Sequence, residues 1–423
     1  MVLSGTVIAA VTLAVVVLTA KSMLLLAAGG DFRVFYSAGW MLRRGADPYD
    51  SASLLHVMVH VTDGPMLRTM MPFPYLPWFG MVMVPFSLLP YWVAFGLWDT
   101  LSFSAVTTAT WWWADTLGWR HAGWTAIGAG FSTVAVFNYA LGQVSTLVLA
   151  LLVGTLLAAN ARHFVLAGAL AVTGALLKPQ DLWPVVPLLW VVPQVPTIAV
   201  LGRILLGQVG AVLVLVGGPL LANAGLLSSW LELVLHSDSR LPSQTALVGL
   251  QLPGLLTFAP QLGLSPGLRD PLVVVLTLFG CLAAVVLVRQ LRKLPVLIWF
   301  HPERRIGWLV LLPLGVWMLS TPYGHTQDVI VAFPLLLLAL GDPRSTLLHP
   351  FSWTLLGAVL VVPFALIFFS DNFYPAHSLA PLGLLILAGG AIIALRRELG
   401  EARRSAVPQE SRAGSPVPLS RTG

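Results

Sequence analysis

The carboxylate of Asp31 directly follows a long apolar run and opens a polar stretch that also contains Arg33. The chain is 57% hydrophobic and only 9% charged, so an acid at this point needs a chemical or structural reason. A carboxylate so placed can act as a general base that takes a proton from a hydroxyl group. It can equally cap a short helix beginning at Phe32, because Asp is a favoured N-cap residue. Both interpretations are open at this point.

Other hydrogen-bonding and charged groups also lie at the ends of apolar runs. They are Asn138 and Gln143 in NYALGQ, Lys178 and Gln180 in KPQD, the pair Gln244-Thr245, and His325 in YGHTQD. Ionisable groups near membrane depth usually face a cavity and pair with one another. Simpler explanations exist as well: Lys178 can snorkel from a helix end, Gln143 can cap the next helix, and His325 can be a solvated loop residue. Taken together, these groups predict one polar cavity.

Metal-binding and nucleotide-binding patterns are missing from the sequence. There is no HExxH, CxxC or DxD pattern, and the nine histidines are scattered. Glycine-rich phosphate loops are also absent, which argues against a nucleotide-driven pump and against a cytosolic nucleotide-sugar donor. The single cysteine, Cys281, lies in an apolar run and excludes an internal disulfide. We therefore expect no metal and no cofactor.

The elements that must position these groups are membrane helices. A mean hydropathy of +0.86 excludes an ordinary soluble domain, and apolar runs of bilayer length recur along the chain. We predict an all-α polytopic membrane protein with about twelve transmembrane helices. The expected spans are 2–28, 91–113, 123–138, 144–160, 164–177, 182–196, 204–222, 271–288, 307–319, 328–340, 351–370 and 378–395.

The segment from Pro72 to Pro90 is expected to be re-entrant or to lie on the membrane surface, because its prolines break a spanning helix. With both termini cytoplasmic, most of the basic residues then face the cytoplasm, as the positive-inside rule requires. Asp31 and the other polar groups accordingly face an outer cavity, and 29–71 forms a first outer loop with surface helices.

Two regions follow from this pattern. Residues 1–397 form the membrane domain, and 398–423, rich in Ser, Pro and Arg, is expected to be a disordered cytoplasmic tail. The sequence pI near 9.8 favours contact with the anionic lipid bilayer and does not indicate nucleic acid.

Several segments occur in a recognisable order. They are DFRVFYSAGWMLRRGADPYD (31–50), FPYLPWFGMVMVPFSLLP (73–90), NYALGQVSTLVLALL (138–152), AGALAVTGALLKPQDLWPVVPLL (167–189) and, as a looser match, TPYGHTQD (321–328). In this order they resemble the motifs of glycosyltransferase family 87, GT-C type mannosyltransferases that use a polyprenyl-phosphate sugar. Leu76 stands where that pattern commonly has proline, and Gln244-Thr245-Ala246 departs from the Asn-Gln-Ser expected there.

The resemblance implies an inverting hexosyltransferase of the cell envelope, in the plasma membrane with its active site outside. Asp31 would be the catalytic base, and Lys178, with His325 and Arg33 as second choices, would bind the donor phosphate. The substrate cavity would include Tyr36, Tyr75, Asn138, Gln143 and Gln180. The partners would be a polyprenyl-phosphate-linked sugar, with mannose expected and arabinose or glucose open, and a glycolipid, lipoglycan or protein acceptor.

Two other classes of protein fit the same composition. A lipid or glycan transporter would also need a polar cavity among interrupted helices, but no inverted repeat is visible and the polar groups gather at one face. A scaffold subunit would keep the helices but would not need Asp31, Gln143 and Lys178 in this order. The sequence favours the transferase.

Overall fold

The computed structural model describes residues 29–62, 72–193, 197–235, 266–293, 301–320, 326–340, 384–397 and 399. Within these ranges every regular element is a helix and none is a strand, which confirms the all-α class. The predicted spans 2–28 and 351–370 lie outside the described residues, as do the Gln244-Thr245-Ala246 segment and nearly all of the predicted tail.

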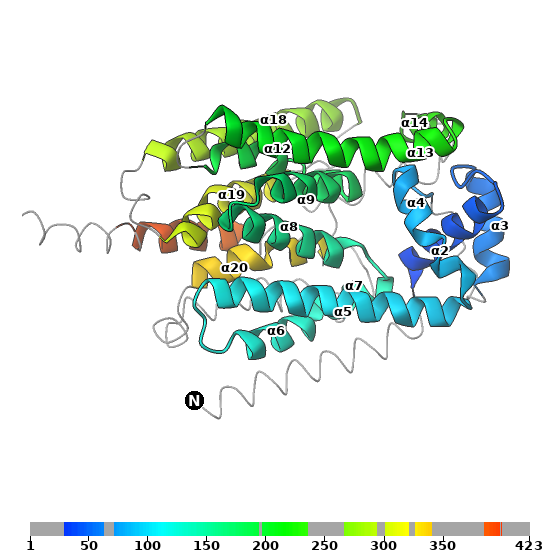
Figure 1. Cartoon of the computed structure of the whole chain (residues 1–423), viewed down its shortest axis with the longest axis horizontal. Helices are drawn as coiled ribbons and strands as arrows, with labels where there is room; N and C mark the ends of the chain where they lie inside the picture. The colour runs from blue at the N-terminus through cyan, green and yellow to red at the C-terminus, as the bar shows by residue number, and fades with distance from the viewer. Residues whose placement is uncertain are drawn as a thin grey trace, which may run out of the picture.

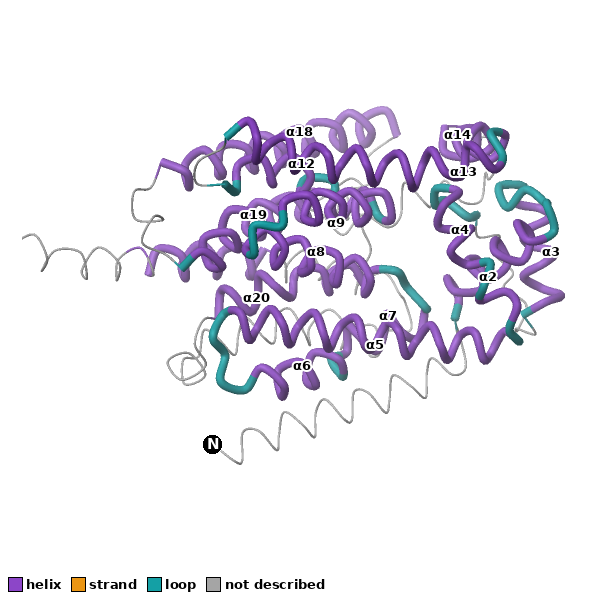
Figure 2. Tube along the Cα trace, viewed as in Figure 1, coloured by secondary structure: helices purple, strands orange, loops and turns teal. Residues whose placement is uncertain are grey.

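A bundle of long helices forms the larger part of the structure (Figure 1). Its members are α5 (Tyr91–Thr116), α8 (Ser145–Asn160), α9 (Phe164–Leu177), α12 (Ile198–Val212), α18 (Pro266–Lys293) and α19 (Pro302–Ser320). Helix α9 packs between α8 and α12, while α8 also contacts α5 and α19. Figure 2 shows α8, α9 and α12 running side by side. The hairpin order of these helices places their connecting turns at two opposite ends.

Short helices gather at one end of this bundle, on the right of Figure 1. They are α2 (Gly30–Arg43), α3 (Ser51–Val61), α4 (Pro77–Met83), η1 (Phe86–Leu88), α13 (Gly218–Ala222) and α14 (Gly225–Leu235). Helix α2 packs against α3 and α4, and Trp230 of α14 donates a hydrogen bond from Nε1 to the carbonyl of Pro74 at 2.9 Å. The described part of the expected first loop, 29–62, is therefore mainly helical, and the proline-rich segment 72–90 forms only short helices.

Two of the predicted spans are broken where local residues interrupt the helix. The span 123–138 divides into α6 (Ala122–Gly130) and α7 (Thr133–Leu141), and Ser132 caps the second helix by accepting a hydrogen bond from Ala135 N at 3.3 Å. The span 182–196 begins instead as α10 (Pro179–Leu182), α11 (Val185–Leu188) and η2 (Leu189–Val191). Prolines supply no backbone N–H to a helix, so Pro184 and Pro187 account for these short pieces.

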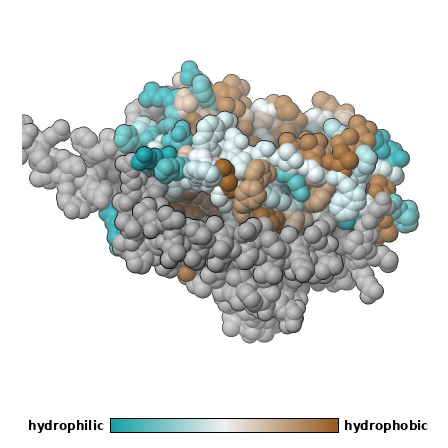
Figure 3. Space-filling model, turned by 90° about the horizontal axis from the view of Figure 1, so that it is seen from below, coloured by the Kyte–Doolittle hydropathy of each residue, from teal (hydrophilic) through white to brown (hydrophobic). Residues whose placement is uncertain are grey.

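One helical stretch among the described residues, Ile198–Ala222, is both long and apolar enough to cross a membrane. It combines α12, the π-helical turn η3 (Leu213–Gly217) and α13. The count of about twelve spans remains a prediction. Apolar side chains cover much of the described surface seen in Figure 3. Exposed large hydrophobic residues include Leu206, Val209, Leu278, Phe279 and Leu282 on α12 and α18.

Small residues set the separation of α9 and α12. A Cβ atom added at Gly207 would lie 1.9 Å from the carbonyl oxygen of Val165, and one added at Gly168 would lie 2.4 Å from that of Ile204. The two backbones therefore touch at this crossing. Because α9 ends immediately before Lys178, this close packing also fixes where that lysine emerges.

Candidate active site

Asp31 lies in the first turn of α2. The helix begins at Gly30, and Gly29 before it has a left-handed φ of 72°. Gly29 is held by its N–H, which donates to the carbonyl of Ala140 at 2.8 Å, and by the hydroxyl of Tyr91, which donates to its carbonyl at 3.3 Å. The N-cap position is occupied by Gly29 and not by Asp31. Its carboxylate is instead available to other elements, near a helix N-terminus whose dipole favours negative charge.

The turn between α7 and α8 brings Gln143 to this carboxylate. Gly142 ends α7 with a left-handed φ of 70°, and the N–H of Gln143 donates to the carbonyl of Asn138 at 2.9 Å. A Cβ at Gly142 would lie 2.5 Å from the Cβ of Phe32, so the turn is pressed against α2. Gln143 Nε2 donates a hydrogen bond to Asp31 Oδ2. Glycine is therefore required here both for its conformation and for the close approach.

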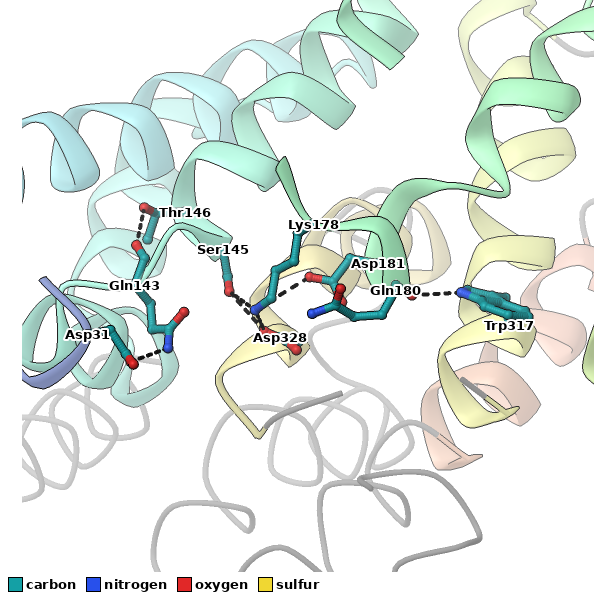
Figure 4. Close-up of polar contacts among 9 residues, drawn as sticks. All are labelled: Asp31, Gln143, Ser145, Thr146, Lys178, Gln180, Asp181, Trp317 and Asp328. Carbon is teal, nitrogen blue, oxygen red and sulfur yellow. Dashed lines mark hydrogen bonds and ion pairs between the residues drawn. The ribbon is translucent and has the colours of Figure 1, made fainter. Parts of the chain in front are cut away.

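Lys178 is the centre of a second, buried group. Its Nζ forms an ion pair with Asp328 Oδ1, donates to Ser145 Oγ at 2.8 Å and lies 3.7 Å from Asp181 Oδ2. The hydroxyl of Ser145 donates in turn to Asp328 Oδ1 at 2.8 Å. Lys178 is only 3% exposed, so it does not snorkel to water. Figure 4 shows the lysine pointing from the end of α9 toward these side chains.

The same short turn joins the two groups. Gln143, which holds Asp31, and Ser145, which holds Lys178, are separated only by Val144. Figure 4 shows Asp31 and Gln143 on one side of the turn and the lysine cluster on the other. Asp328 enters from η7 (Thr326–Ala332), which packs against both α7 and α8. The turn thus fixes the position of the Asp31 carboxylate relative to the Lys178 ammonium, although the two residues are far apart in the sequence.

Removal from water dominates the ionisation of Asp31. Burial raises the pKa of its carboxyl to about 6, while Lys178 and the hydrogen bond from Gln143 oppose that rise and Asp328 adds to it. An acid with a pKa near 6 is mostly ionised at neutral pH, and it is basic enough to accept a proton during a reaction. Asp31 therefore has the ionisation expected of a general base.

The surroundings of Lys178 and Asp181 raise the pKa of both groups, which favours a charged lysine and a protonated aspartate. Burial alone would lower the pKa of Lys178, but the charges of Asp328, Asp181 and Asp31 and the hydrogen bond to Asp328 leave that pKa above its usual value. Burial, and then repulsion by Asp328, raise the pKa of Asp181 well above its usual range, against the effect of Lys178. The lysine is therefore charged, and Asp181 tends to keep its proton.

Arg33, a predicted phosphate ligand, is placed on another face of α2. Its Nη1 donates to the carbonyl oxygen of Thr62 at 3.0 Å and to Thr62 Oγ1 at 2.6 Å, and its guanidinium lies 4.8 Å from the ring centre of Tyr91. These contacts tie the end of α3 to α2. His325, the other second choice, lies outside the described residues. A phosphate-binding role for either residue remains a prediction.

The predicted cavity residues other than Gln143 make contacts within their own helix or with neighbouring elements. The hydroxyl of Tyr36 donates to the carbonyl of Leu89 at 2.7 Å, and the ring of Tyr75 packs 5.1 Å from that of Phe35. Asn138 is fully buried and donates to Val134 within α7 at 2.8 Å. The backbone carbonyl of Gln180 accepts from Trp317 at 2.8 Å. Their predicted role toward a substrate is untested by these contacts.

Sequence reasoning gave no site role to Ser145, Asp181 or Asp328, although both aspartates lie in the polar segments KPQD and YGHTQD that it considered. A signal was present for the two acids, because a buried lysine needs carboxylate partners. Asp181 follows Lys178 by one helical turn, and Asp328 is the last polar residue before an apolar run. Among the described residues, no group of three or more His, Cys, Asp or Glu side chains is arranged to hold a metal ion.

Comparison with known proteins gave one match. The family model described as glycosyltransferase family 87 matches residues 73–301, a region that contains Gln143 and Lys178 and lies between Asp31 and Asp328. Neither the curated proteins nor the solved structures yielded a match. The family match covers more than half of the chain. The chain therefore belongs to glycosyltransferase family 87, a family of membrane glycosyltransferases.

Proposed function

We propose that this glycosyltransferase moves a hexose, with mannose expected, from a polyprenyl-phosphate donor to a hydroxyl group of a glycolipid or lipoglycan. The observation that carries the proposal is that one turn, through Gln143 and Ser145, holds both the Asp31 carboxylate, with its pKa of about 6, and the buried Lys178. A sugar-phosphate donor needs these two functions: a base for the acceptor and a cation for the leaving group.

Asp31 serves as the general base. Its carboxylate takes the proton of the acceptor hydroxyl while that oxygen attacks the anomeric carbon and the bond from this carbon to the phosphate oxygen breaks. Attack from the opposite face inverts the anomeric centre, so a β-linked donor yields an α-glycoside. Base catalysis of this kind contributes roughly 10²–10⁴-fold in rate.

Lys178 stabilises the negative charge that grows on the leaving phosphate. A preorganised cation in a site shielded from water is worth more than one in solution, because little solvent must reorganise during the reaction. Nζ is held in place before any substrate binds, by Ser145 and Asp328. Arg33 and His325 remain second choices for the same phosphate.

The site is proposed to face outward from a multi-pass membrane domain. The α5–α6 and α8–α9 turns, the start of α12, the end of α18 and the start of α19 lie at the opposite end of the bundle (Figure 1). In the sequence these segments contain Arg120, Arg162, Arg203, Arg292, Lys293, Arg304 and Arg305. An excess of Lys and Arg is typical of the cytoplasmic side. The end of the bundle that carries α2 and Asp31 then lies outside, where a lipid-linked donor and an envelope acceptor can meet.

The tryptophans of α5 support the placement of this helix across the bilayer. Trp92 and Trp111 are exposed by 51% and 46% and are separated by 19 residues of helix. At 1.5 Å per residue this separation is about 29 Å, close to the roughly 30 Å thickness of a bilayer hydrocarbon core. Exposed tryptophans at two such levels are typical of the two membrane interfaces.

The first test measures transfer of radiolabel from polyprenyl-phosphate-mannose into lipid by membranes containing the native chain or Asp31→Asn. We expect a new labelled glycolipid with the native chain only, because asparagine keeps the shape of the side chain but cannot accept the proton. Equal amounts of folded protein, measured by detergent size-exclusion chromatography, serve as the control. Full activity of Asp31→Asn would remove the base assignment. Purified native protein that makes product in detergent would exclude a pure transporter.

A further inference from the structure

The two carboxylates beside Lys178 are bound differently. Oδ1 of Asp328 accepts hydrogen bonds from both Lys178 Nζ and the Ser145 hydroxyl. Oδ2 of Asp181 lies 3.7 Å from the same Nζ, and the described part of the chain supplies no hydrogen-bond donor to it. Hydrogen bonds to an ionised carboxylate favour the ionised form, whereas burial without them favours the protonated form.

The net charge of the cluster also distinguishes Asp181 from Asp328. Lys178 is a single cation facing Asp31 from α2, Asp181 from α10 and Asp328 from η7. If all three acids were ionised, the buried cluster would be strongly negative and would repel a phosphate group. With Asp181 protonated, Lys178 and Asp328 balance each other, and Asp31 alone keeps a charge of its own.

We propose that Asp328, by its charge, and Ser145, by its hydroxyl, are positioning residues that hold Lys178 Nζ toward the donor phosphate, while Asp181 stays neutral. This inference rests on the proposed function, which makes Lys178 the phosphate ligand. It assigns different roles to two buried aspartates that are both in reach of one lysine.

Fixing the Lys178 side chain before the donor binds has a benefit for catalysis. A lysine ammonium sits on a flexible four-carbon stem and loses conformational freedom when it is fixed. Contacts from Ser145 and Asp328 fix it before the donor arrives, and the α7–α8 turn sets its place relative to Asp31. A cation placed in this way contributes to catalysis without reorganising in the transition state.

The pH at which Lys178 loses its proton can be compared between variants. Burial lowers the pKa of this lysine and Asp328 is the first of the charges that raise it, so neutralising Asp328 lowers that pKa. Donor binding needs the charged lysine, so the alkaline limb of kcat/KM for the donor moves to lower pH. Asp181 lies farther from Nζ than Asp328 and raises the pKa of Lys178 less, so replacing it with asparagine moves the alkaline limb less.

The test compares Asp328→Asn with Asp181→Asn in the purified full chain, using polyprenyl-phosphate-mannose and a membrane lipid extract as acceptor. For Asp328→Asn we expect a donor KM at least about tenfold higher and an alkaline limb at lower pH, because one partner of a buried ion pair is lost. Asp328→Glu restores the charge and should return the limb toward its native position. For Asp181→Asn we expect the limb to move less than for Asp328→Asn.

The outcomes separate this inference from the proposed function. If the native chain transfers sugar and Asp31→Asn does not, an unmoved limb in Asp328→Asn, or equal shifts in both asparagine variants, overturns the inference. If the native chain transfers no sugar from this donor, the proposed function fails instead.

Ser145→Ala is a second variant that keeps every charge. It should raise the donor KM severalfold without moving the alkaline limb, because Lys178 Nζ loses one of its fixing contacts and no counter-charge. Should Asp328→Asn fail to fold, an unchanged donor KM in Ser145→Ala overturns the inference on its own.

Discussion

The carboxylate of Asp31 can accept a proton only when it is ionised, and its neighbours set the pH at which that happens. Burial raises its pKa to about 6, against Lys178 and the amide of Gln143. As pH falls through 6 the base becomes protonated, so we expect the rate of transfer to be full above this value and to be lost below it. An initial-rate profile of kcat/KM against pH measures this acid limb.

Gln143→Leu should move that acid limb to higher pH. Leucine keeps much of the side-chain volume but removes the N–H that stabilises the ionised carboxylate, so the pKa of Asp31 rises further. Thr146→Val is the matched control, because Thr146 lies on the same turn and its hydroxyl bonds to the carbonyl of Gln143 rather than to Asp31. A limb that moves equally in both variants would show that the hydrogen bond to Asp31 is not what sets it.

Site residues could be predicted from the sequence only where a short motif contains them. Asp31, Gln143 and Lys178 stood out in their motifs, and the structure places them around one turn. The pairing of Asp328 with Lys178 was not predicted, because 150 residues separate them in the sequence. No local pattern reveals such a partner, since only the packing of η7 against α8 brings the two together.

At the scale of elements, the glycine that ends α7 is expected to matter for both stability and rate. In Gly142→Ala a left-handed conformation costs about 1–2 kcal/mol, and the new Cβ, 2.5 Å from that of Phe32, forces the turn away from α2. Gln143 and Ser145 then move relative to Asp31. We expect a lower Tm in detergent together with a clear loss of kcat.

Gly45→Ala is the control for this prediction. Gly45 has nearly the same φ, 71° against 70°, but a Cβ there would meet nothing within 4 Å. Its substitution should therefore lower Tm by a similar conformational cost and leave kcat unchanged. If the two variants lost kcat to the same extent, the fit of the α7–α8 turn against α2 would not be the cause.

Helix positions were predictable where hydropathy was uninterrupted, as in α9, whose bounds coincide with the expected 164–177. They were less predictable where Ser132 or clustered prolines divide an apolar run, because hydropathy does not register a lost backbone donor or a cap. The region after Lys178 shows this well. The single turn of α10 places Asp181 beside the lysine, and α11 follows it as a second short helix.

At the scale of the whole molecule, the orientation of the bundle decides on which side of the membrane Asp31 lies. The small helices around Asp31 form one end and the arginine-rich turns form the other (Figure 1). Between these ends, Trp92 and Trp111 of α5 are about one hydrocarbon thickness apart. A donor with a long lipid tail can reach Asp31 and Lys178 only from the face on which they lie, so orientation decides whether the proposed reaction can occur outside.

Cysteine labelling tests that orientation, because Cys281 is the only cysteine and Cys281→Ala gives a background without thiols. Ala46 and His121 are both exposed, one between α2 and α3 and the other before α6 at the far end of α5. A membrane-impermeant maleimide should label Ala46→Cys in intact cells and His121→Cys only after permeabilisation. The background protein should stay unlabelled throughout. The reverse order, or labelling of both positions in intact cells, would place Asp31 on the wrong side for an outward-facing transferase.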